Sequence, residues 1–281
     1  MAFSVASWNV EFFGSRRKGG SHADVAERVD RVFDYLKDEI DADVFAIYEV
    51  NGRSVFDKVI SDFPDYSWQI TEGGGAQQIL VGFRIPAFVS QRLEFSKGFA
   101  GLLRPGLLVT AIHEGQNYPM LFLHLKSADH PVDFGVRTYQ HERARSLRKA
   151  LDRATAPERS NFIVAGDFNT LGMDVTFSDS DLAIADEIAR LNDMYSSRHD
   201  QMRVRPKTAE ATFWNGPGSS SPPVDLDHVV AAKRVAFEQD QDGNEVEVKG
   251  WPEATTDVDR KAWINDFSDH ALLRFTVTGA G

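Results

Sequence analysis

Short apolar stretches recur along the chain and predict β-strands. Residues 3–10 alternate between apolar and polar positions, which is typical of a strand, and residues 44–50 form a continuous apolar run, as in a fully buried strand. Asp242-Gly243 lies between two apolar stretches and is a typical hairpin signal. The expected strands are residues 3–10, 44–50, 78–83, 107–112, 120–125, 162–165, 226–231, 235–238, 245–248 and 272–277.

Apolar residues at helical spacing predict helices between these strands. Val25, Val29 and Leu36 recur on one face of the first helix, which follows the polar starter Asp24. The expected helices cover residues 25–40, 56–63, 136–154 and 182–191. Strands and helices in alternation favour an α/β fold in which outer helices cover two sheets.

The length of the chain favours a single domain. At 281 residues it is close to the size up to which one hydrophobic core serves a whole chain. The one linker-like segment, residues 216–223, is short and lies between motifs that must converge, so we interpret it as a surface loop. We therefore expect one domain over residues 1–281.

Composition narrows the chemistry and the partners. Because there are no cysteines, a metal must be held by carboxylates, amides, imidazoles or water, which favours Mg²⁺ or Mn²⁺. The net charge of −11 argues against a protein that coats nucleic acid, but a nuclease needs only a local positive field. The N-terminus has no visible secretory signal, so a cytoplasmic location is expected, with a processed secreted form left open. No apolar run is long enough to span a membrane, and the oligomeric state is not indicated.

Polar residues that can bind metals or transfer protons stand at the ends of six predicted strands. Each one alone has an ordinary explanation, such as a solvated strand end or a turn. Open sheets present their ligand sites at strand ends, so the joint presence and order of these residues predict a functional site. The residues are Asn9, Glu11, Glu49, His124, Asp167, Asn169, Asp227, Asp269 and His270.

Three of these motifs closely resemble those of the endonuclease/exonuclease/phosphatase superfamily. They are Gly-Asp-Phe-Asn at residues 166–169, Ser-Asp-His at residues 268–270 and His-Leu-Lys-Ser at residues 124–127. The superfamily includes exonuclease III-like repair nucleases, DNase I, sphingomyelinases and inositol polyphosphate 5-phosphatases. The resemblance covers residues 7–273 and implies a DNase I-like, four-layer α/β sandwich with two central mixed sheets flanked by helices.

The resemblance also implies a metal site. Glu49 is expected to be the principal metal-binding carboxylate, for Mg²⁺ or Mn²⁺. Asn9, Glu11 and Asp269 are expected to line the metal and to orient water or phosphate. Glu11 departs from the pattern of many members, which have Asp or another residue there, and this makes its role the least defined of the four.

The remaining residues are expected to carry the chemistry. By resemblance, Asp167 handles a proton of the attacking water or the leaving group, and Asn169 holds that group together with a phosphoryl oxygen. His270 contacts the scissile phosphate, and Asp227 fixes the tautomer of His270 through the second ring nitrogen. His124 donates to a non-bridging oxygen. Phosphoryl transfer needs such donors because charge develops on these oxygens.

The sequence therefore predicts a metal-dependent phosphoesterase, and three functions compete. The first is a nuclease, endo- or exonucleolytic, that acts on nucleic acid. The second is a phosphatase or phosphodiesterase on a small or lipid phosphoester. A non-catalytic binding module is disfavoured because every expected catalytic position holds a competent residue, and Ser-His-Asp acyl hydrolysis is disfavoured because no Gly-x-Ser-x-Gly elbow is present.

Two basic groups bear on the choice of substrate. Arg16-Arg17-Lys18 follows Glu11 closely and is a candidate phosphate clamp. The predicted helix over residues 136–154 is rich in arginine, and its arginines are expected on a solvated face. These are Arg137, Arg143, Arg145 and Arg148.

Overall fold

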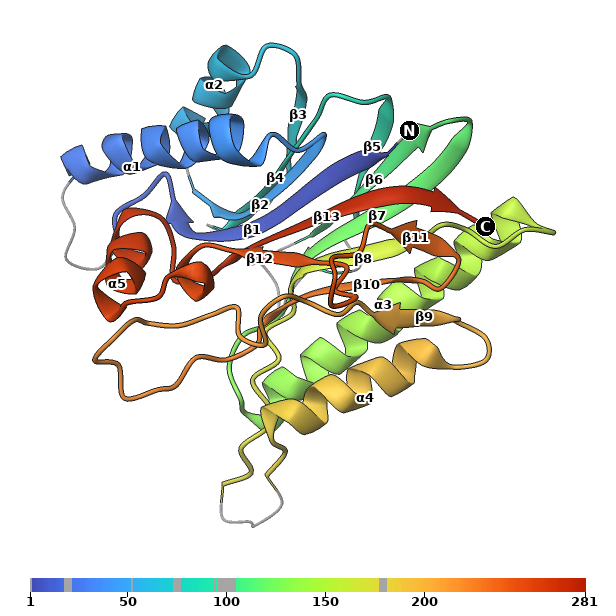
Figure 1. Ribbon diagram of the computed structural model, residues 1–281. Coiled ribbons are helices and arrows are strands. Elements are labelled where there is room, and N and C mark those ends of the chain that lie inside the picture. The colour runs from blue at the N-terminus through green and yellow to red at the C-terminus, as the bar shows by residue number, and fades with distance from the viewer. Residues whose placement is uncertain are drawn as a thin grey trace.

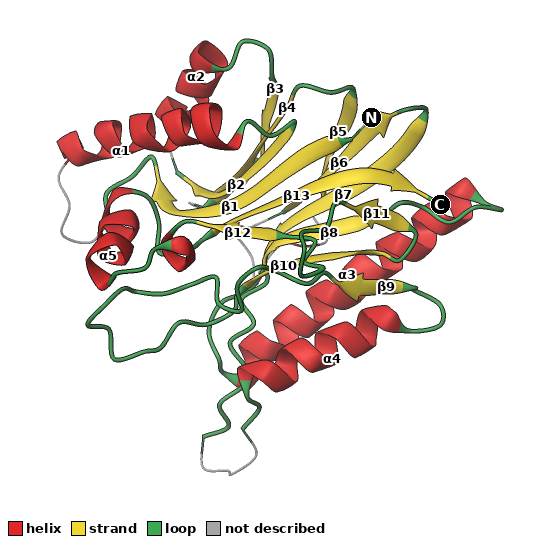
Figure 2. Ribbon diagram, in the orientation of Figure 1, coloured by secondary structure: helices red, strands yellow, loops and turns green. Residues whose placement is uncertain are grey.

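Two β-sheets pack face to face and helices cover both outer faces, as the computed structural model shows (Figures 1 and 2). It describes residues 2–17, 22–51, 53–72, 77–92, 95, 105–176 and 181–281. In this part of the chain no helix is long and apolar enough to cross a membrane. The predicted four-layer α/β sandwich is confirmed.

The first sheet is built around β1 (Phe3–Phe13), which runs parallel to β2 (Val44–Val50) and antiparallel to β13 (Leu272–Ala280). Among the described residues the strand order is β11-β13-β1-β2-β4-β3, and β12 also pairs with β13. The other strands are β3 (Ser67–Ile70), β4 (Gln78–Phe83), β11 (Val235–Phe237) and β12 (Glu247–Lys249).

The second sheet brings three strand ends to one edge. β7 (Gln116–His124) runs parallel to β8 (Ile163–Asp167), and His124 lies opposite Asp167. β10 (Asp227–Ala232) is antiparallel to β8, so it begins where β8 ends, with Asp227 opposite Asp167. The order is β5-β6-β7-β8-β10-β9, in which β5 is Ala87–Arg92, β6 is Gly106–His113 and β9 is Met202–Val204.

The helices lie outside the sheets. α1 (His22–Tyr35) and α2 (Arg53–Asp62) cover the first sheet, and α3 (Pro131–Thr155) and α4 (Ile184–Ser196) cover the second (Figure 1). A π-helical turn at Leu36–Ile40 extends α1, and a 3₁₀ turn at Trp251–Glu253 precedes α5 (Asp257–Asp266).

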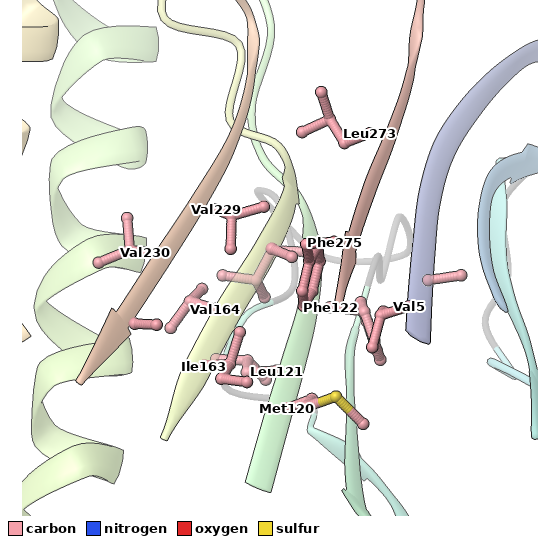
Figure 3. Packing of buried hydrophobic residues seen from close by; sticks show 14 of the residues in the cluster. Val5, Met120, Leu121, Phe122, Ile163, Val164, Val229, Val230, Leu273 and Phe275 are labelled. Atoms are coloured by element: carbon pink, nitrogen blue, oxygen red, sulfur yellow. The ribbon is translucent and has the colours of Figure 1, made fainter. Parts of the chain in front are cut away.

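β1 is buried on both faces and contributes to two separate hydrophobic cores. Val5 packs between the sheets, in the same cluster as Phe122, Val164 and Phe275 (Figure 3). Trp8 belongs to the second core, which lies beneath α1 and α2. Because neighbouring side chains of a strand point to opposite faces, one strand serves both cores.

Three sequence expectations differ from the structure. The 235–238 and 245–248 stretches do not form a hairpin with each other, because β11 and β12 both pair with β13. The turn itself is present, since Gly243 N donates to Asp240 O at 3.2 Å. The helix expected from residue 182 begins at Ile184, because Leu182 bridges to Met173 instead. β3, β5, β9 and α5 were not predicted.

Candidate active site

The polar residues predicted at strand ends converge on one cleft of about 360 Å³. The cleft lies where β1, β2, β7 and β8 end and where the segment before β13 begins. Asp227 stands behind the cleft, in contact with His270. The predicted residues that line it are Asn9, Glu11, Glu49, His124, Asp167, Asn169, Asp269 and His270.

His270 is held on several sides. Its Nδ1 lies 2.8 Å from Asp227 Oδ2, and its backbone oxygen accepts from Trp8 Nε1 at 2.9 Å. The ring of Phe213 packs against the imidazole, with the ring centres 4.8 Å apart. Burial lowers the pKa of His270, but the carboxylates of Asp227 and Asp167 outweigh burial and raise the pKa to about 10.

Asp167 is the centre of the hydrogen-bond network and is 1% exposed. Its Oδ2 accepts from Asn9 Nδ2 at 2.9 Å and lies 3.3 Å from His124 Nε2. Its Oδ1 accepts from the backbone N of Asn169 at 2.9 Å. Asn9 Nδ2 also lies 3.4 Å from His270 Nε2, so one amide lies beside both Asp167 and the histidine.

Three carboxylates, those of Glu11, Glu49 and Asp269, also line the cleft. Burial raises the pKa of Glu11, and the charge of Asp269 raises it further. Burial also raises the pKa of Asp269; His270 opposes this shift and Glu49 adds to it. Glu49 Oε1 lies 3.7 Å from His124 Nε2, and Glu49 Oε2 accepts from Phe12 N at 3.1 Å.

These groups fit a hard divalent cation. Although Arg17 lies 2.6 Å from Glu11, the pKa values of Glu11 and Asp269 stay raised, so a bound cation would stabilise the charged carboxylates further. The buried Oδ1 of Asn9 accepts no hydrogen bond from any residue that the structure describes. An oxygen-rich group with an unused amide oxygen is what Mg²⁺ or Mn²⁺ prefers.

A second set of potential ligands lies close by. One oxygen or nitrogen atom from each of Asp167, Asp227 and His270 comes within 4.8 Å of the others. Asp227 and His270 are already hydrogen-bonded to each other, and Asp167 accepts on both of its oxygens. All three residues of this set are therefore already engaged in hydrogen bonds.

Left-handed backbone conformations line one rim of the cleft. Phe12 (φ 50°), Glu49 (φ 61°) and Gln77 (φ 75°) sit at the ends of β1, β2 and β4. The strand register places these ends side by side, since Phe13 is opposite Val50 and Val50 is opposite Gln78. Non-glycine residues rarely adopt this conformation, and such residues cluster at functional sites.

Two of the α3 arginines, Arg137 and Arg148, are buried, which corrects the sequence expectation for them, whereas Arg143 is exposed as expected and Arg145 is half-buried. Arg137 is 0% exposed and pairs with Glu187, with Nε 2.9 Å from Oε1. Its guanidinium also donates to the carbonyl oxygens of Ala128 and Gly172. Those residues belong to the loops that follow His124 and Asn169, so Arg137 ties the two loops of the cleft together. Arg148 is also buried, against Asp152.

In the candidate phosphate clamp, Arg16 is exposed and Arg17 is engaged with Glu11 and α5. Arg17 Nε lies 2.6 Å from Glu11 Oε2, and Arg17 Nη1 donates to Ile264 O at 2.7 Å. Arg17 therefore fixes the loop after β1 to α5, while Lys18 lies outside the described residues.

Several residues that support the site were not assigned a role from the sequence. Ser268 Oγ donates to Asn9 O at 2.7 Å and accepts from His270 N at 3.1 Å, which fixes the histidine segment against β1. Ser268 belongs to the Ser-Asp-His motif, so the sequence indicated that this segment is part of the site. The sequence gave no such indication for the structural role of Arg137, because its partner Glu187 is distant in the chain.

The two-sheet sandwich, with carboxylates, amides and histidines at its strand ends, defines the class of DNase I-like phosphoesterases. The sequence model of the Endonuclease/Exonuclease/phosphatase family matches residues 6–270, and the chain belongs to this family. The resemblance seen in the sequence is thus confirmed. Members of the family are hydrolases that act on phosphoester bonds, and they generally use a divalent metal.

Solved structures share the fold at low sequence identity. D. rerio TDP2, humanized by 14 mutations, superposes with a TM-score of 0.65 at 15% identity, with 99% of each chain covered. D. rerio TDP2 complexed with a single-strand DNA product gives a TM-score of 0.63 at 16% identity, again over 99% of each chain. The family protein from Bacteroides vulgatus gives 0.63 at 15% identity over 100% of both chains. A comparison with curated protein sequences gives no match.

Proposed function

We propose that this protein is a divalent-metal-dependent nuclease, which hydrolyses phosphodiester bonds of nucleic acid. The observation that carries the proposal is the convergence of Asp167, His270 and Asn9 in a single cleft, where the Asn9 amide donates to Asp167 and lies beside His270. Support for nucleic acid as substrate comes from the similar fold of TDP2 complexed with a single-strand DNA product. The net charge of −11 favours instead a small or lipid phosphoester, which remains the competing substrate class.

The geometry supports a division of labour between Asp167 and His270. N–H donors reach both oxygens of Asp167, an arrangement that stabilises the carboxylate anion. Asp167 is then ready to accept a proton from the attacking water. His270, with a pKa of about 10, is a cation at neutral pH and is suited to bind a phosphoryl oxygen. Asp227 holds that cation in position.

The metal site in this proposal consists of Glu49 as principal ligand, with Glu11, Asp269 and the Oδ1 of Asn9 around it. A bound Mg²⁺ or Mn²⁺ supplies positive charge that offsets the charge developing on the phosphoryl oxygens. Asn169 and His124 line the same cleft, where they would contact the leaving group and a non-bridging oxygen. Glu49 is held for its role by the backbone N–H of Phe12.

The test is cleavage of plasmid, single-stranded DNA and RNA by the purified protein, with Mg²⁺ or with chelator. Asp167→Ala and His270→Ala are each expected to lower the rate by a factor of ~100 or more. Asp257→Ala and His199→Ala are matched controls at exposed positions, and they are expected to leave the rate unchanged. Hydrolysis of a phosphomonoester or phospholipid, with all three nucleic acids intact, would replace the nuclease with the competing class.

A further inference from the structure

We propose that the ring of Phe12 is a stacking platform for the base of the nucleotide that adjoins the scissile phosphate. This inference rests on the proposed function and adds to it a preference for unpaired bases. Phe12 is a large hydrophobic residue with 40% of its surface exposed, and it lines the cleft. Phe13, the next residue, is fully buried in the core beneath α1 and α2. Burial in a core therefore explains Phe13 but not Phe12.

The backbone conformation of Phe12 argues against a purely structural role for its aromatic ring. A bulky residue at φ 50° is strained, and glycine adopts that conformation at much lower cost. The conformation is fixed by three hydrogen bonds: Phe12 N donates to Glu49 Oε2 at 3.1 Å, and Phe12 O accepts from the N and Oγ of Ser15 at 2.9 and 3.1 Å. All three use the main chain or another residue's side chain, so none of them needs the ring.

The same hydrogen bonds locate the ring relative to the chemistry. Because the backbone N–H of Phe12 holds the carboxylate of Glu49, the ring stands within one side chain's length of the proposed metal ligand. A group that stacks on the ring while a phosphate occupies the cleft must be joined closely to that phosphate. In nucleic acid the group at that distance is the base of the adjoining nucleotide.

The chemistry of the rim favours a base over an acyl chain. Gln77, Ser127 and Asn169 also line the cleft, so polar groups stand beside the apolar surface that Phe12 contributes. A flat ring beside polar groups matches a base, which has an aromatic face and a polar edge. Stacking on protein requires a base that is free of its duplex neighbours, so the site favours single-stranded or frayed nucleic acid.

The experiment compares two polymers of equal length and charge: oligo(dT), and a polymer of abasic tetrahydrofuran phosphates. The measured quantity is the ratio of kcat/KM on oligo(dT) to kcat/KM on the abasic polymer. Phe12→Ala is expected to lower this ratio on the order of 10-fold, and Phe12→Trp to keep it within about 2-fold of wild type. Phe12→Gly is expected to match Phe12→Ala in this ratio, while its melting temperature is no lower, because glycine relieves the strain.

Phe88→Ala is the matched control, since Phe88 is 71% exposed on β5 and does not line the cleft. It is expected to leave the ratio as in wild type. The inference is overturned if Phe12→Ala leaves the ratio unchanged. If both polymers are then also cleaved more slowly than by wild type, the residue is a support for Glu49. A wild-type protein that cleaves neither polymer and also leaves plasmid and RNA intact would instead contradict the proposed nuclease, so the two failures are distinguishable.

Discussion

His270 Nδ1 lies 2.8 Å from Asp227 Oδ2, and this contact decides which edge of the imidazole faces the cleft. The opposite nitrogen, Nε2, is left beside Asn9 Nδ2 at 3.4 Å. Asp227 is fixed in turn by its strand, because it lies opposite Asp167 in the pairing of β10 with β8. The sheet register therefore sets the distance between the proposed proton acceptor and the residue that orients the histidine.

Asp227→Asn tests this relationship. The amide is isosteric but removes the charge that contributes most to raising the pKa of His270, so that pKa is expected to fall. We expect kcat to drop on the order of 100-fold and the alkaline limb of the pH–rate profile to move to lower pH. The melting temperature should change little. Steady-state kinetics across pH 6–10 check this, and turnover equal to wild type at every pH would rule out the role of Asp227.

Glu49→Gln tests the proposed metal site. The substitution keeps the shape and an acceptor for the Phe12 N–H but removes the anionic ligand proposed as the principal one. The Mg²⁺ concentration that gives half-maximal activity is expected to rise by about 10- to 100-fold. Glu72→Gln, at an exposed position outside the cleft, serves as the control. A half-saturation that stays at the wild-type value would show that Glu49 does not bind the ion.

Arg137 and Glu187 form a buried pair whose loss should affect stability and the cleft together. Arg137→Met leaves Glu187 as a buried, unpaired charge and is expected to cost about 3–5 kcal/mol of unfolding free energy. Arg137→Met combined with Glu187→Leu should recover much of that stability. Because the double variant still lacks the donors to Ala128 and Gly172, its kcat should stay reduced. Urea unfolding and kinetics separate the two effects, and full recovery of kcat would refute the loop-tying role.

The sequence indicates the sandwich and the convergence of the strand-end residues because both depend on local pattern. Residues 44–48, for example, are apolar in sequence and lie in β2 as expected. The sequence does not indicate pairings that depend on distant partners. The hairpin expected around Asp242-Gly243 does not form, because both stretches pair with β13 and not with each other. The left-handed backbone of Phe12 also has no sequence signal, since only Gly, Asn and Asp favour it.

Acid should destabilise the fold through His141. Burial lowers the pKa of His141 to about 3, so the folded state keeps this residue neutral while the unfolded chain binds a proton below about pH 6.5. Stability is therefore expected to fall as pH drops from 6.5 towards 3, by about 1.4 kcal/mol per pH unit from this group. His141→Gln should flatten that dependence. Urea unfolding at pH 4 to 8 measures it, and equal slopes for the two proteins would exclude His141 as the cause.

Asp269→Asn is expected to change the stability in opposite directions with and without metal. Burial raises the pKa of Asp269, so at neutral pH its negative charge opposes folding when no cation is bound. In chelator, the amide should therefore raise the melting temperature. When a cation is bound, the same charge stabilises the folded state. The free energy of unfolding of wild type should rise by about 2.7 kcal/mol at a Mg²⁺ concentration 100 times its Kd, and that of the variant by less. Thermal unfolding with chelator and over a Mg²⁺ series measures both effects without relying on activity. A variant that is less stable than wild type in chelator would mean that the carboxylate is already compensated by the protein, and the metal site would then have to lie elsewhere in the cleft.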